Sequence, residues 1–162
     1  MTIPTWSLLG FATWTLLLLM ATVGVYRWTR VILSDAPLAS FRSDRLEGAD
    51  WYQRGTRAHA NCVENLPVFA AVVFVISASG LQGSVVDTLC VIVLIARVFQ
   101  STVHISRPQT DRVVAVRFFF FSVQLVCFFT LIALAVAHTQ WNSIRSFATT
   151  TGPEKYFLTP SE

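Results

Sequence analysis

The sequence predicts an all-α membrane protein, a bundle of four transmembrane helices, and composition and spacing both support this fold class. Of the 162 residues, 54% are hydrophobic and 13% are charged, and the mean hydropathy is +0.57. The apolar residues gather into four segments, each with a run of about 20 residues that carries little charge, which is the length a helix needs to cross a bilayer. Polar segments that contain Pro, Gly or both separate them.

The four predicted spans cover residues 6–32, 50–79, 85–105 and 112–138. No positive charge precedes the first span, and its apolar run exceeds a signal-peptide core, so we expect it to be retained. The second contains Pro67, which predicts a kink. We therefore expect a four-helix membrane domain over residues 1–138 and, because its Thr, Ser and Pro residues show no periodicity, a loosely ordered tail over residues 139–162.

Basic residues predict the orientation of the chain in the membrane. The loops after the first and third predicted spans are rich in arginine, whereas the opposite side has only Arg145 and Lys155. The positive-inside rule therefore predicts cytoplasmic loops and periplasmic or lumenal termini. The net charge of +3 does not indicate a nucleic-acid partner, because several arginines fall within apolar segments rather than in exposed clusters.

The three cysteines predict neither a disulfide framework nor a metal site. Cys62, Cys90 and Cys127 lie far apart within apolar segments. A metal site built from His59, Glu64 and His104 is poorly spaced, so we expect none.

Polar residues recur on one face of three spans, at spacings that match the helical repeat. These stripes are Arg57, Asn61 and Glu64 on the second span, Arg97, Gln100 and His104 on the third, and Arg117 and Gln124 on the fourth. Charged residues at bilayer depth persist mainly where water or partners receive them. We therefore expect the stripes to converge on a cationic, amide-lined pocket, within one subunit or between subunits, that opens to the cytoplasm.

A small anion with several carboxylates is the ligand that such a pocket favours, because arginine pairs with carboxylates in a bidentate way. A thiol held in the same positive field favours its thiolate form. The alternative is that the stripes pair with one another and specify helix packing. Arg27 and Arg30, three residues apart at the end of the first span, either contact the ligand or reach lipid headgroups.

The second-span stripe resembles the signature of the MAPEG superfamily, the membrane-associated proteins in eicosanoid and glutathione metabolism. The resemblance is carried by Arg57-Ala58-His59, Asn61, Glu64-Asn65 and Pro67-x-Phe69. Four spans, the chain length, lumenal termini and arginines at positions 97 and 117 agree with it, so it covers nearly the whole chain. The superfamily includes microsomal glutathione transferases, prostaglandin E synthase, leukotriene C synthase and the non-catalytic lipoxygenase-activating protein.

The resemblance implies a homotrimer that binds glutathione between adjacent subunits and receives a lipid-soluble electrophile from the membrane lipids. Arg117 matches a fourth-helix arginine that stabilises the glutathione thiolate, and Arg97 matches the arginine that opens the third-helix motif, so these two are the catalytic candidates. The candidates for binding glutathione are Arg57, Asn61, Glu64, Gln100, His104 and either Arg27 or Arg30.

At three positions the sequence differs from members of the superfamily that form eicosanoids or carry other residues there, and these differences bear on the expected activity. His104 stands where eicosanoid-forming members have tyrosine, Gln100 replaces a histidine of some members, and Phe118 stands where prostaglandin E synthase has serine. These differences argue against prostaglandin or leukotriene synthesis. We therefore expect a glutathione S-transferase or peroxidase that acts on hydrophobic electrophiles, the alternative being a non-catalytic lipid-binding or scaffold protein on the same fold.

Overall fold

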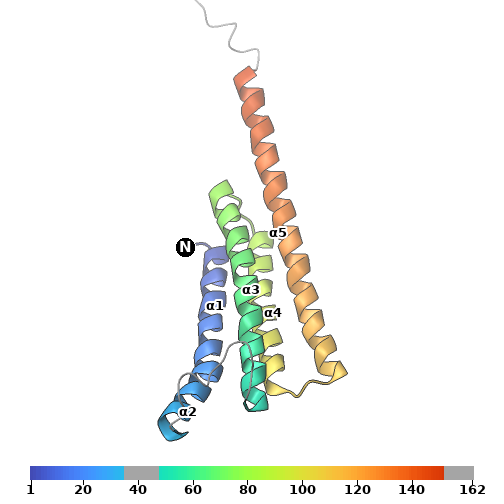
Figure 1. Ribbon diagram of the computed structural model, residues 1–162. Coiled ribbons are helices and arrows are strands. Elements are labelled where there is room, and N and C mark those ends of the chain that lie inside the picture. The colour runs from blue at the N-terminus through green and yellow to red at the C-terminus, as the bar shows by residue number, and fades with distance from the viewer. Residues whose placement is uncertain (35–47, 152–162) are drawn as a thin grey trace, which may run out of the picture.

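The computed structural model describes residues 1–34 and 48–151, and every regular element in these residues is a helix. The elements in chain order are α1 (Ile3–Leu18), η1 (Leu19–Gly24), α2 (Val25–Ser34), α3 (Asp50–Ser79), α4 (Ser84–Ser106) and α5 (Asp111–Thr151). Together α1, η1 and α2 form the first long helix. The described residues thus contain four helices that are long and apolar enough to cross a membrane, packed as a bundle (Figure 1). The predicted all-α, four-helix architecture is confirmed.

The first long helix contains a π-helical turn that the sequence did not predict. We expected a plain α-helix over residues 6–32, but residues 19–24 form η1. Within it the Thr22 hydroxyl donates to the carbonyl oxygen of Leu18 over 2.5 Å. The same turn lies close to Gly55 of α3. A Cβ added to Gly55 would lie only 2.5 Å from the Cβ of Thr22. Only glycine therefore fits at this crossing.

Helix α3 runs through Pro67 as one helix and covers the predicted residues 50–79. It ends at Gly80, whose φ of 68° lies in the left-handed region that glycine adopts without strain. Trp51 and Tyr52 belong to its first turns. The polar loop that we expected before α3 lies mainly in residues 35–47, outside the described residues, together with Arg42 and Arg45.

The core of the bundle is centred on three aromatic rings. Phe69 of α3 lies between Phe11 of α1 and Phe128 of α5, with ring centroids 5.7 and 5.9 Å apart. All three side chains are buried. They therefore join three of the four long helices, whereas large apolar side chains on the outside, such as Phe74 and Phe129, are exposed as expected of a surface that faces lipid or another subunit.

Helix α5 is longer than the other helices and projects beyond them at its C-terminal end (Figure 1). The predicted fourth span ended at His138 and was followed by a loosely ordered tail. This was wrong for residues 139–151, which continue the helix to Thr151. Residues 152–162 lie outside the described residues. The Thr and Ser residues that suggested a loose tail are tolerated here because they follow directly on a helix that is already formed.

Candidate functional site

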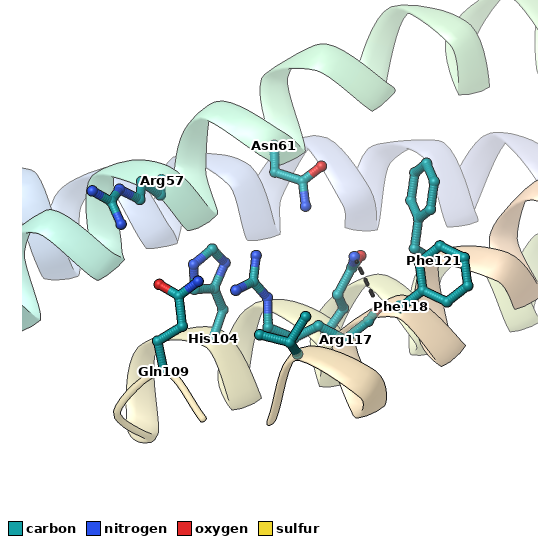
Figure 2. A pocket seen from close by; sticks show the side chains of 9 residues that line it. Arg57, Asn61, His104, Gln109, Arg117, Phe118 and Phe121 are labelled. Carbon is teal, nitrogen blue, oxygen red and sulfur yellow. Dashed lines mark hydrogen bonds between the residues drawn. The ribbon is translucent and has the colours of Figure 1, made fainter. Parts of the chain in front are cut away.

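Helix α3 supplies Arg57 and Asn61, four residues apart on one face. The Asn61 side chain is oriented by Asn65, whose Nδ2 donates to the Asn61 carbonyl oxygen over 2.8 Å and to Asn61 Oδ1 over 3.2 Å. Because Asn65 satisfies the Asn61 acceptor, the two N–H donors of Asn61 stay available. Figure 2 shows Asn61 pointing from α3 toward side chains of α4 and α5.

Helix α4 supplies Gln100 and His104, which are 4% and 7% exposed. Gln100 Nε2 donates to the carbonyl oxygen of Arg117 over 3.3 Å. Nearby, Arg54 of α3 donates from Nε to the carbonyl oxygen of Ile105 over 3.1 Å. This bond ties α3 to the last turn of α4 and occupies one of the carbonyls that a helix end leaves without an intrahelical partner.

Helix α5 supplies the second arginine of the site and an apolar wall. Arg117 is half-buried, and its Nε is buried without a hydrogen-bond partner in the part of the chain that the structure describes. Val114, Phe118 and Phe121 also line the cavity and follow one another at spacings of four and three residues, which places them on one side of α5. One side of the site is thus cationic and amide-rich, and the other is apolar.

These side chains line an open cavity of about 470 Å³. Its lining residues are Arg57, Asn61, Gln100, His104, Gln109, Val114, Arg117, Phe118 and Phe121 (Figure 2). The volume falls within the range of about 300–1,000 Å³ that is typical of small-molecule sites. The cavity lies at the end of the bundle where α4 is joined to α5, because Gln109 belongs to that connection.

Two arginines, Arg57 and Arg117, make the cavity positively charged, and the described residues give neither of them a carboxylate partner. A cation at membrane depth is costly unless water, a partner or a ligand receives it. The cavity is therefore suited to an anion.

Five of the nine residues expected to form the site line this cavity: Arg57, Asn61, Gln100, His104 and Arg117. Four do not. Glu64 is exposed on α3 outside the cavity, and Arg30 is exposed on α2. Arg27 Nε donates to the Tyr52 hydroxyl over 3.3 Å, which holds it against the start of α3.

Arg97 is the fourth residue outside the cavity, and it lies in the interior of the bundle. It is 1% exposed, and its guanidinium carbon lies 5.3 Å from the centroid of the Phe11 ring. Its Nε and Nη2 have no hydrogen-bond partner within the described residues. It shares a face of α4 with Gln100 and His104, but in the structure it is packed against α1 rather than the cavity.

The sequence did not assign Gln109, Val114, Phe121 or Asn65 to the site, and it did not predict the contact that Gln124 makes. Gln109 lies in the loop after Pro108, where no periodicity assigns a direction to a side chain. Asn65 belongs to the recognised motif but had no assigned role, although its spacing of four from Asn61 could have suggested the contact. Gln124 was placed on the fourth-span stripe, but its bond to Gln100 depends on how α4 and α5 pack.

The described residues contain no group of three or more His, Cys, Asp or Glu side chains that could hold a metal ion. His59, Glu64 and His104 are thus not gathered into a metal centre in this part of the chain.

Comparison with known proteins assigns the family. The family model of the MAPEG family matches residues 4–137, which is most of the chain. No curated protein and no solved structure matched the chain. The matched region includes every residue that lines the cavity. The chain therefore belongs to the MAPEG family and is a multi-pass integral membrane protein of the eicosanoid and glutathione metabolism type.

Proposed function

We propose that this protein binds glutathione in the cavity between α3, α4 and α5 and acts as a glutathione S-transferase or peroxidase on lipid-soluble electrophiles. One observation carries the proposal. Arg57 and Arg117 line a single cavity, and neither is paired with a carboxylate in the described parts of the chain. An anionic ligand would satisfy both cations.

The chemistry of the cavity fits glutathione. The ligand carries two carboxylates, which match the two arginines, and its amide carbonyls are acceptors for the free donors of Asn61. The buried Nε of Arg117, which has no partner among the described residues, supplies a further donor. His104 and Gln109 add polar groups on the same side.

The polar and the apolar residues of the cavity have different roles in the proposed reaction. Bound glutathione supplies a thiol that is nucleophilic once ionised. Arg117 provides a fixed positive charge in a partly buried site, where it stabilises negative charge better than in water. Val114, Phe118 and Phe121 form an apolar wall that would receive a lipid-soluble electrophile next to that charge.

Arg97 takes an indirect role in this proposal. It does not line the cavity, so it would act by adding to the positive potential behind the site rather than by touching the ligand. Glu64 and Arg30 are exposed on the outside of the subunit. They would reach a ligand only across a subunit interface, which is compatible with a homotrimer that binds glutathione between neighbours. The same holds for Arg27, unless it serves only to hold Tyr52.

The cavity would open on the cytoplasmic side, with the termini periplasmic or lumenal. The support is that Gln109 follows Arg107 in the connection between α4 and α5, one of the arginine-bearing loops.

A second candidate function is favoured by a separate observation. Between α3 and α5 lies an apolar groove of about 640 Å³, lined by Pro67, Val68, Ala71, Val72, Val75, Ile132, Ala135 and Val136. A groove of this composition suits an acyl chain, and it supports a non-catalytic lipid-binding or scaffold protein on the same fold.

Glutathione binding to the purified, detergent-solubilised protein tests the proposal. We expect wild type to bind glutathione, to show thiolate absorbance and to conjugate a generic electrophile, and we expect Arg117→Met to lose the thiolate absorbance and nearly all of the conjugation. Arg112→Met is the matched control, because Arg112 is exposed on the same helix and does not line the cavity. A wild type that binds lipid but neither binds nor ionises glutathione would establish the second candidate instead.

A further inference from the structure

Gln100, which lines the cavity, and the buried Gln124 form a chain of hydrogen bonds that ends at Arg117. Gln124 Nε2 donates to Gln100 Oε1 over 3.0 Å, and Gln100 Nε2 donates to the carbonyl oxygen of Arg117 over 3.3 Å, the bond that is dashed in Figure 2. From these contacts we infer that Gln124 is a positioning residue of the proposed site. It orients the amide of Gln100, which in turn holds α5 against α4 at Arg117.

The orientation of the Gln124 amide is determined by its surroundings. Gln124 is fully buried, and besides the bond to Gln100 its Nε2 donates to the carbonyl oxygen of Phe120 over 3.1 Å. Both N–H donors of the amide are thus used. Turning the amide by half a rotation would place Oε1 against two acceptor oxygens, so the observed orientation is the one that the site permits.

This orientation fixes the role of Gln100. Its Oε1 is engaged as the acceptor for Gln124, so its N–H group is the part that faces Arg117. Gln100 was expected from the sequence to bind glutathione. In the structure its contacts connect α4 to α5, and one N–H of its amide remains available for a ligand.

The hydrogen bond from Gln100 is made to Arg117, the residue on which the proposed chemistry depends. It holds the backbone of Arg117, whose side chain enters the cavity with a buried, unpaired Nε in the described structure. Gln124 Oε1 has no hydrogen-bond partner among the described residues either. The donor function of Gln124 is therefore the one that is used, and loss of the donor should misplace Arg117.

Two substitutions of Gln124 distinguish the effect of its hydrogen-bond donors from the effect of its side-chain volume. Gln124→Met keeps a similar size but removes both donors, whereas Gln124→Glu in its neutral form keeps one O–H donor. Gln140→Met is the matched control, because Gln140 is exposed on the same helix. All variants are first compared with wild type by thermal unfolding in detergent, and Gln124→Glu provides the test if Gln124→Met does not fold.

The first readout does not require glutathione. Phenylglyoxal labels accessible arginines, and mass spectrometry gives the labelling rate of Arg117 relative to Arg57. Because loss of one buried hydrogen bond shifts an equilibrium about fivefold, we expect Gln124→Met to change this ratio by about that factor. Gln140→Met should leave the ratio unchanged, and Gln124→Glu should stay near wild type while its carboxyl is neutral. A ratio that is the same in all four proteins overturns the positioning role.

The second readout rests on the proposed function. We expect Gln124→Met to lower kcat for glutathione conjugation about tenfold with a smaller change in KM, because misplacement of Arg117 weakens stabilisation of developing charge more than binding. In Gln124→Glu, kcat should fall as the pH is raised through ionisation of the introduced carboxyl, since a carboxylate cannot donate to Gln100. If wild type neither binds nor conjugates glutathione, the proposed function fails, and the labelling ratio still decides the role of Gln124.

Discussion

The guanidinium of Arg97 lies 5.3 Å from the centroid of the Phe11 ring, inside the bundle and away from the cavity. Both side chains are almost completely buried, at 1% and 0% exposure. A buried cation without a carboxylate partner is costly, and the face of an aromatic ring offsets part of that cost. The contact with Phe11 therefore lowers part of the cost of keeping this charge in the core of the bundle.

Phe11→Leu should destabilise the protein by about 1–3 kcal/mol, because it removes the cation–π contact to Arg97 and part of the packing against Phe69. The measurement is unfolding in mixed detergent. Phe74→Leu is the control, since Phe74 is 72% exposed on the outer surface and should change stability by about 0.5 kcal/mol or less. Equal losses in the two variants would show that the interior pair contributes nothing specific.

Arg117→Met and Arg97→Met should differ in their effect on turnover. Arg117 lines the cavity and Arg97 does not. We expect Arg117→Met to reduce kcat for conjugation about 100-fold or more, as for loss of a donor at developing charge, and Arg97→Met to reduce it by less than about tenfold. Steady-state kinetics of both variants provides the comparison. The reverse order would mean that Arg97 reaches the reacting groups directly.

Asn61→Asp should weaken glutathione binding more than Asn61→Ala. The aspartate retains an acceptor for Asn65, but it replaces the free N–H donors with a negative charge that faces an anionic ligand. We expect a loss of about tenfold or more for the aspartate variant relative to alanine, since close like charges at a partly buried site cost at least about 1.4 kcal/mol.

Equilibrium binding of glutathione to the two Asn61 variants checks this expectation. Asn142→Asp is the matched control, because Asn142 is exposed on α5 outside the cavity. Equal affinities for Asn61→Asp and Asn61→Ala would place the ligand away from Asn61.

Gly55→Ala should destabilise the contact between η1 and α3. An added Cβ would lie 2.5 Å from the Cβ of Thr22, an atom that can move only with the backbone. The expected cost is about 1–3 kcal/mol, as for overpacking in a core. Gly10→Ala should cost less, because its new Cβ meets only the movable end of Leu94, 2.9 Å away. Detergent unfolding of the two variants measures the difference, and a smaller effect at Gly55 would contradict the close crossing.

Sequence and structure agree where the signal is local. The four spans follow from runs of apolar residues, and hydrophobicity accumulates along the chain whatever the neighbours are. The shared face of Arg57 and Asn61 follows from helical spacing, and both line the cavity. The motif around them led to the family, which the match over residues 4–137 confirms. Composition also placed Phe69 in an apolar segment, although not between Phe11 and Phe128.

The sequence by itself thus determined the fold class, the family and one wall of the site, whereas the packing of the helices decided the rest. Spacing places Arg97, Gln100 and His104 on one face of α4, but only the rotation of that helix in the bundle sends Arg97 toward Phe11 and the other two toward the cavity. The bond from Gln124 to Gln100 likewise requires two helices in register. The physical reason is that helical periodicity specifies an angle around one axis, and contacts between helices depend on how several axes are placed together.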